Sequence, residues 1–142
     1  MIFKRKNGFR NRENDLVISG KIVSGAGEGA YFTQIGWVRQ QCDEKLGFKP
    51  YPGTLNLEIS EEFLPAIELL DQKTGVELIS PDPQFCNARV FQVSLQDIIG
   101  AVILPEKKVR IHPKNIIEII APLNIKAFLN VKDGDSLNVV FT

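Results

Sequence analysis

Polar and apolar residues alternate along much of this chain with a period of two, which is the pattern of strands buried on one face. The clearest run is 54–59, where leucine, leucine and isoleucine alternate with threonine, asparagine and glutamate. Short aliphatic and β-branched runs predict seven further strands, at 16–23, 76–79, 88–95, 98–104, 107–112, 116–121 and 136–142. Asp133-Gly134-Asp135 is a turn signal directly before the last of them. The pattern therefore predicts a mainly β chain.

Helical patterns are few. The segments 33–46, 63–70 and 123–129 are predicted helices. Gly47 would end the first, and Ser60 followed by two glutamates would begin the second, which places Pro65 in its first turn. Many short strands separated by glycine and proline favour a sandwich or a barrel, and closure into a barrel would remove exposed sheet edges.

Length and charge indicate one ordinary globular domain. The chain has 142 residues, 44% of them hydrophobic, with 17 basic and 17 acidic side chains. A zero net charge argues against a nucleic-acid-binding protein, because such proteins usually carry a basic excess. The basic residues at the start predict a flexible segment at 1–15 ahead of a barrel domain at 16–142. With no signal peptide and no apolar run of about 18 residues, we expect a cytoplasmic protein without membrane contact.

Cysteine and histidine give no sign of a metal cluster. Cys42 and Cys86 are not spaced as a CxxC pair, which favours a reduced chain but leaves a single disulfide open. His112 is the only histidine, so a zinc site and a Ser-His-Asp triad are both disfavoured. The candidate chemistry therefore rests on three other segments.

The first segment is Ser24-Gly25-Ala26-Gly27-Glu28-Gly29-Ala30, in which three glycines occupy alternate positions after a predicted strand. Glycine has no Cβ, so such a backbone can bend tightly and bring its N–H groups close to phosphate oxygens. The spacing matches neither the dinucleotide-binding fingerprint nor the Walker loop. A plain glycine-rich turn and an anion-binding loop are both open from this segment alone.

The second segment is Gly47-Phe48-Lys49-Pro50-Tyr51-Pro52-Gly53-Thr54-Leu55-Asn56-Leu57, where two prolines and a glycine predict a rigid turn before a strand. Thr54 and Asn56 are two residues apart and so project from one face. Their neutral oxygens suit Mg²⁺ that also keeps water and phosphate ligands. The alternative is an ordinary polar face of an amphipathic strand.

The third segment is Ile116-Ile117-Glu118-Ile119-Ile120-Ala121-Pro122, which sets one carboxylate within an apolar run. An inward-facing Glu118 would suit proton transfer, whereas an outward-facing Glu118 would be an ordinary strand carboxylate. The segment alone favours neither interpretation.

In their order and spacing, four stretches resemble the archaeal CTP-dependent riboflavin kinase family, namely 20–32, 46–57, 117–122 and 129–135. The likeness extends over most of the chain, from 20 to 141. It implies a compact six-stranded cradle-loop barrel with a few short helices. It also implies an enzyme that transfers the terminal phosphoryl group of CTP to the riboflavin 5′-hydroxyl, with Mg²⁺ as cofactor and CDP and FMN as products. We expect it to act as a monomer.

The resemblance also implies roles for named residues. Glu118 would be the catalytic residue and would contact the flavin, and Thr54 and Asn56 would bind Mg²⁺. The nucleotide would be held by two short stretches, Gly25, Ala26, Gly27, Glu28, Gly29 and Ala30 in the first, and Leu123, Asn124, Ile125 and Lys126 in the second.

This chain departs from the family pattern near two of these places. After the Ala-Pro pair the family often has a basic residue followed by Leu-Arg, whereas this chain has Asn124-Ile125-Lys126, and lysine lacks the planar fork of arginine. Arg110 stands where a small hydroxyl residue is common, and an inward-pointing Arg110 would pair with the flavin phosphate. The alternative function is a non-catalytic flavin- or nucleotide-binding regulatory module on the same barrel.

Overall fold

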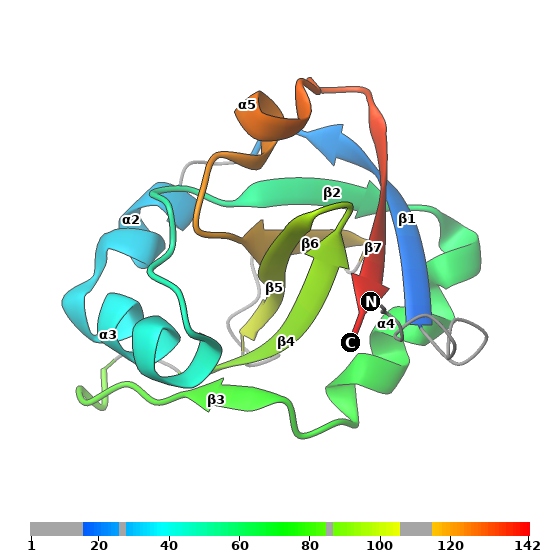
Figure 1. Ribbon diagram of the computed structural model, residues 1–142. Coiled ribbons are helices and arrows are strands. Elements are labelled where there is room, and N and C mark those ends of the chain that lie inside the picture. Colours follow the sequence, from blue (N-terminus) through cyan, green and yellow to red (C-terminus); the bar gives the residue numbers. More distant parts are fainter. Residues whose placement is uncertain (1–15, 26–27, 85–86, 106–114) are drawn as a thin grey trace, which may run out of the picture.

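The computed structural model describes residues 16–25, 28–84, 87–105 and 115–142 of the chain. Short strands dominate it, with helices between β1 and β2, between β2 and β3, and between β6 and β7 (Figure 1). The elements are β1 (Leu16–Val23), α2 (Glu28–Gln34), α3 (Gly36–Leu46), β2 (Leu55–Ile59), the 3₁₀ helix η2 (Glu61–Phe63), α4 (Leu64–Asp71), β3 (Val76–Leu78), β4 (Ala88–Leu95), β5 (Ile98–Pro105), β6 (Ile116–Ile120), α5 (Ile125–Leu129) and β7 (Ser136–Phe141).

Six of the strands form a closed antiparallel barrel. The order of the sheet is β3-β4-β5-β6-β2-β1-β7, and a further pairing of β4 with β7 closes it. Residues 88–90 of β4 pair with β3, and residues 93–94 pair with β7, so β3 extends the sheet beside the barrel. The predicted mainly β fold with a six-stranded barrel and a few short helices is thereby confirmed.

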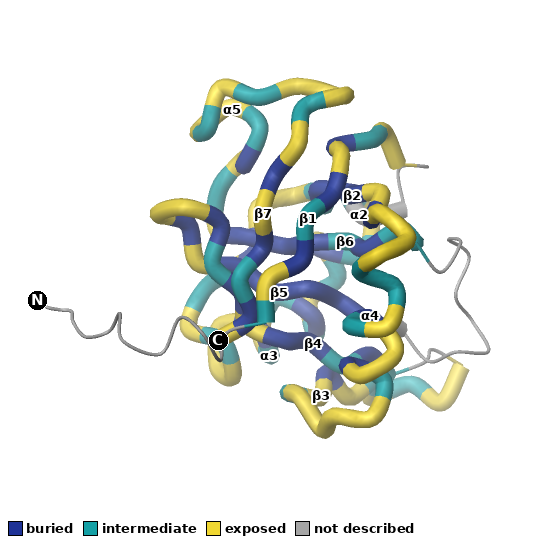
Figure 2. Tube along the Cα trace, turned by 90° about the vertical axis from the view of Figure 1, so that its right-hand side faces the viewer, coloured by how far each residue is buried: buried dark blue, intermediate teal, exposed yellow. Residues whose placement is uncertain are grey.

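Alternate residues of the barrel strands build two separate hydrophobic clusters. The larger one takes a side chain from each barrel strand, such as Ile18, Leu57 and Ile117, and fills the inside. The smaller one lies on the outer face of β4, β5 and β6, where Val38 and Cys42 of α3 cover it. Buried residues follow the strands in Figure 2, whereas the helices and turns carry most of the exposed ones. Outward-facing residues of β2 and β6 therefore lie on the same side as α2 and α3.

Most predicted elements match the structure to within a residue or two at each end. The predicted strand 107–112 and the predicted N-terminal segment 1–15 lie outside the described residues. The predicted single helix 33–46 is wrong, because extended backbone at Ile35 (φ −66°, ψ 131°) separates α2 from α3. Pro65 lies in the first turn of α4, as the sequence predicted, where its missing N–H leaves no hydrogen bond unmade.

Two further predictions concern the membrane and the cysteines. In the described ranges, no helix combines the length and the apolar character that a membrane span requires. Cys42 is a free thiol with no exposed surface, and its burial raises its pKa to about 11. It therefore stays protonated and unreactive at neutral pH. Cys86 lies outside the described residues.

Candidate active site

Three of the predicted site residues meet on the outer face of β2 and β6. Asn56 of β2 is the register partner of Glu118 of β6, and on its other side it pairs with Val23 of β1. Thr54, two residues before Asn56, donates a hydrogen bond from its Oγ1 to Glu118 Oε1 at 2.9 Å. Because side chains alternate along a strand, these three project away from the barrel interior, on the side that carries α2 and α3. Glu118 is half-buried there.

Asn56 is a buried polar residue with an unmade hydrogen bond. Its side chain is 6% exposed, and among the described residues no donor reaches its Oδ1. An acceptor left in this state costs about 1–3 kcal/mol, so a native structure that keeps one usually has a use for it. No three His, Cys, Asp or Glu side chains in the described part of the chain are grouped to hold a metal. A neutral buried oxygen beside a threonine hydroxyl fits Mg²⁺ that takes its remaining ligands from phosphates and water.

The first glycine of the predicted nucleotide stretch lies directly against Asn56. A Cβ added at Gly25 would be 2.0 Å from Asn56 Nδ2 and 3.0 Å from its Cγ, which no real side chain tolerates. The chain after β1 can therefore pass over Asn56 only with glycine at this position. This contact brings the predicted nucleotide and metal residues together.

The rest of that stretch is only partly a loop. Ala26 and Gly27 lie outside the described residues, whereas Glu28, Gly29 and Ala30 form the start of α2. Both interpretations that the sequence left open took the segment as a turn or loop as far as Ala30, whereas its last three residues are helical. The three alternate glycines hid the helix from sequence analysis, because glycine is a poor helix former.

The proline-rich turn before β2 is held from three directions. Gly53 N donates to Thr33 Oγ1 of α2 at 2.8 Å, and Tyr51 N donates to the carbonyl oxygen of Ala121, after β6, at 2.8 Å. Arg39 of α3 donates from Nη1 to the carbonyl oxygen of Pro50 at 3.3 Å. Gly53 has a φ of +123°, which only glycine adopts without strain. The turn thus presents Thr54 in a fixed position.

Thr33 holds the turn before β2 through a hydrogen bond that the sequence did not reveal. It has no exposed surface, and its hydroxyl also donates to Ala30 O at 3.2 Å. A threonine hydroxyl inside a helix gives no pattern that marks it as an anchor for a turn 20 residues later.

Thr33→Val should destabilise the protein by about 1–2 kcal/mol, because the shape is kept while Gly53 N loses its acceptor. Urea unfolding measures the change. Thr74→Val is the matched control, since Thr74 is exposed and should change stability by no more than about 0.5 kcal/mol. Equal effects of the two substitutions would show that the Thr33 hydroxyl does not hold the turn.

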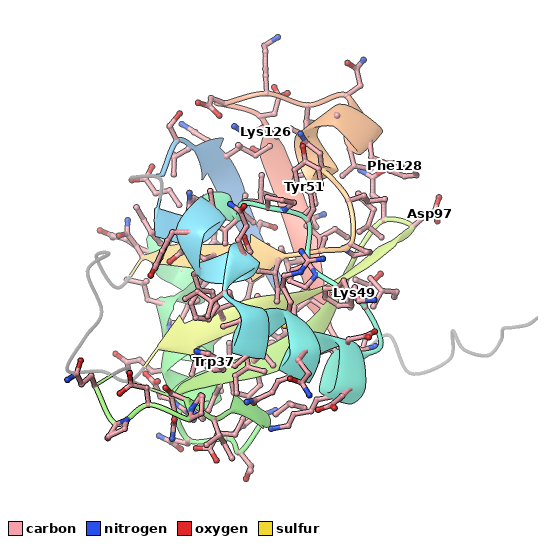
Figure 3. The ribbon with its side chains drawn as sticks, turned by 90° about the vertical axis from the view of Figure 1, so that its left-hand side faces the viewer. Trp37, Lys49, Tyr51, Asp97, Lys126 and Phe128 are labelled. Carbon is pink, nitrogen blue, oxygen red and sulfur yellow. The ribbon has the colours of Figure 1, made fainter. Side chains whose placement is uncertain are left out.

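The second predicted nucleotide stretch has a mixed character. Ile125 is 5% exposed and belongs to the barrel core, and Leu123 packs against that core. Asn124 caps α5, because its side-chain oxygen accepts a hydrogen bond from Ala127 N at 3.2 Å. Lys126 is the one charged side chain of the four. Figure 3 shows Lys126 and Tyr51 on the same face of the molecule.

Asp133 links this stretch to the glycine stretch. Its Oδ1 accepts a hydrogen bond from Lys126 Nζ at 2.7 Å, and its Oδ2 accepts one from Ser24 Oγ. These three residues are called the Asp133 cluster below. The hydrogen bond from Lys126, followed by that from Ser24, holds the pKa of the Asp133 carboxyl below its ordinary value, so the carboxylate stays ionised at neutral pH. Sequence analysis identified Asp133 only as a turn residue, and Arg110 lies outside the described residues.

Comparison with known proteins shows the family to which this chain belongs. A family model named for CTP-dependent riboflavin kinase, and described as a domain of unknown function, DUF120, matches residues 22–141. Curated relatives named riboflavin kinase include those of Pyrobaculum aerophilum, Archaeoglobus fulgidus and Pyrococcus furiosus.

These relatives are similar along most of this chain and longer than it. The Pyrobaculum aerophilum protein is 38% identical over 84% of this chain and 58% of its own length. The Archaeoglobus fulgidus protein is 36% identical over 89% of this chain and 55% of its own length. The Pyrococcus furiosus protein is 39% identical over 87% of this chain and 57% of its own length. This chain therefore spans a little over half the length of the curated relatives it matches. By the match to residues 22–141, which takes in the end of β1 and the whole of the other five barrel strands, it belongs to the family of the CTP-dependent riboflavin kinase domain.

Proposed function

We propose that this chain is a riboflavin kinase that transfers the terminal phosphoryl group of CTP to the riboflavin 5′-hydroxyl. One observation carries the proposal: Thr54, Asn56 and Glu118 share one outer face, and Gly25 lies against Asn56. A polar surface strand would not need a buried asparagine whose oxygen receives no donor from the part of the chain that the structure describes. The names of the family and of the relatives supply the substrates of the proposal.

Phosphoryl transfer depends mainly on alignment and on compensation of charge. In this reaction a bond forms between the riboflavin 5′ oxygen and the terminal phosphorus of CTP. The bond from that phosphorus to the bridging oxygen breaks, and CDP leaves. When bound through Thr54 and Asn56, Mg²⁺ supplies the positive charge that phosphates require.

The residues of this chain divide the remaining work. Glu118 orients the attacking hydroxyl and accepts its proton, and its hydrogen bond from Thr54 fixes the carboxylate. The stretch that begins at Gly25 brings the triphosphate next to Asn56. Lys126 adds a positive charge at the other nucleotide stretch. The barrel provides the rigid support for these groups.

A direct assay tests the function. Purified protein is incubated with riboflavin, Mg²⁺ and either CTP or ATP, and the flavins are separated by chromatography. The proposal expects FMN with CTP, little with ATP, and none when Mg²⁺ is chelated. FMN formed equally well from ATP would overturn the donor assignment, and flavin binding without conversion would support the non-catalytic module.

Glu118→Gln should lower kcat about a hundredfold, because the amide keeps the size of the side chain but cannot accept the proton. Steady-state kinetics with CTP and riboflavin measure the loss. Glu58→Gln is the matched control, since Glu58 lies two residues beyond Asn56 on β2 and is exposed. If the two substitutions lower kcat alike, Glu118 has no part in the chemistry.

A further inference from the structure

The Asp133 cluster lies between the two stretches that the proposed function assigns to the nucleotide. Ser24, which donates to Asp133 Oδ2, directly precedes Gly25 at the end of β1. Lys126, which donates to Asp133 Oδ1, is in α5. One carboxylate therefore contacts both stretches, although they are about a hundred residues apart in the chain.

The turn that carries Asp133 does not need this carboxylate for its own structure. Gly134 N donates to Ile22 O at 2.9 Å, and Ile22 N donates to Asp135 O at 2.8 Å, so backbone bonds fix the turn to β1. Within the turn, Asp135 Oδ2 accepts from Lys132 N at 2.8 Å. Gly134 takes the left-handed conformation that a tight turn requires, with φ +96°. The side chain of Asp133 is thus left for contacts outside the turn.

The ion pair between Lys126 and Asp133 is too exposed to contribute much to the stability of the fold. The side chains of Lys126 and Asp133 are 41% and 47% exposed, and ion pairs in such surroundings contribute little to folding. Their effect on orientation is larger, because a lysine has four rotatable bonds and samples many rotamers when no partner holds it. A lysine already fixed beside a ligand loses less freedom when the ligand binds.

We propose that Asp133 is a positioning residue of the nucleotide site, which orients the Lys126 ammonium and fixes Ser24 before a nucleoside triphosphate binds. The proposal rests on the proposed function, in which Lys126 and the stretch from Gly25 contact the nucleotide. It makes the side chain of Asp133, though not the rest of the turn at 132–135, part of the substrate-binding apparatus. It also explains why Asp133, rather than Asp135, faces the two stretches.

Asp133→Asn tests this in the full chain. The amide cannot hold the ammonium by charge, so the KM for CTP should rise about tenfold while kcat and the KM for riboflavin stay within about twofold. Ser24→Ala removes the other contact alone and should raise the KM for CTP by about threefold. If the substitution instead disturbed the fold as a whole, kcat would fall and the KM values for both CTP and riboflavin would rise.

Lys126→Met provides the second arm. If Asp133 acts mainly through Lys126, adding Asp133→Asn to Lys126→Met should raise the KM for CTP by no more than about threefold further, the share expected from the Ser24 contact, since the ammonium to be oriented is already gone. Fully multiplied effects of the two substitutions would overturn the proposal, because they would show that Asp133 acts independently of the lysine.

Asp135→Asn is the matched control from the same turn. It turns the charged acceptor for Lys132 N into a neutral, weaker one, and should lower thermal stability slightly without changing the KM for CTP. An equal rise in KM for Asp135→Asn would assign the effect to the turn as a whole and overturn the role of Asp133. An unchanged KM for Asp133→Asn in an active enzyme overturns this inference alone, whereas a wild-type chain that forms no FMN overturns the proposed function and this inference with it.

Discussion

Asn56→Ala should lower kcat about a thousandfold or more, because it would remove the side-chain oxygen proposed to hold Mg²⁺ and with it the positive charge that compensates the transferring phosphoryl group. The same substitution should change the stability of the ligand-free protein little. It loses some packing, but it also removes an acceptor that is 6% exposed and has no donor among the described residues. Kinetics at rising Mg²⁺ concentration and thermal unfolding measure the two effects.

The increase in thermal stability on ligand binding distinguishes loss of the metal site from loss of the fold. Wild-type protein should unfold at a higher temperature when Mg²⁺ and CTP are present together, because ligands that bind the native state stabilise it. Asn56→Ala should lose most of that increase. Asn138→Ala is the matched control: Asn138 is an exposed asparagine on β7, and its side-chain oxygen accepts a hydrogen bond from Ser19 Oγ. A folded Asn56→Ala protein with normal kcat and normal Mg²⁺ dependence would remove Asn56 from the metal site.

The strands could be predicted because their signal is local. In β2 the alternation of leucine and isoleucine with polar residues marks which side chains face the core, and the structure places Leu55, Leu57 and Ile59 in the barrel interior. The same alternation put Thr54 and Asn56 on one face. It could not tell that Glu118 would stand opposite Asn56, because strand pairing depends on the whole barrel.

The contacts that complete the site come from distant parts of the chain. Thr33 reaches Gly53, and Asp133 reaches Ser24 and Lys126, through side chains whose sequence surroundings are ordinary. A turn aspartate and a helical threonine have frequent local uses, so their type alone indicates no partner. Such residues can be recognised only when the fold brings their hydrogen-bond donors to them.

Gly25→Ala should lower kcat/KM about a thousandfold, through steric conflict rather than through lost backbone freedom. The added Cβ would lie 2.0 Å from Asn56 Nδ2, and the Asn56 side chain is buried. Either the stretch after β1 or the Asn56 amide must shift, and displacements of about 1 Å near a reacting phosphate already cost about a hundredfold. Steady-state kinetics with CTP measure the loss, and both the KM for CTP and kcat should change.

Gly36, where an added Cβ has free space around it, supplies the control. A Cβ added at Gly36, the first residue of α3, would meet nothing within 4 Å, so Gly36→Ala should leave activity unchanged and stability equal or slightly higher. The double variant Gly25→Ala/Asn56→Ala separates the effect of the steric clash on stability from the effect of the Asn56 oxygen on activity. The clash in Gly25→Ala should also lower thermal stability. Shortening Asn56 removes the clash, so the thermal stability of the double variant should return toward that of the wild type. Its activity should stay low, because the side-chain oxygen of Asn56 is missing. Recovery of activity together with stability would mean that Gly25 serves only to make room for a side chain the reaction does not use.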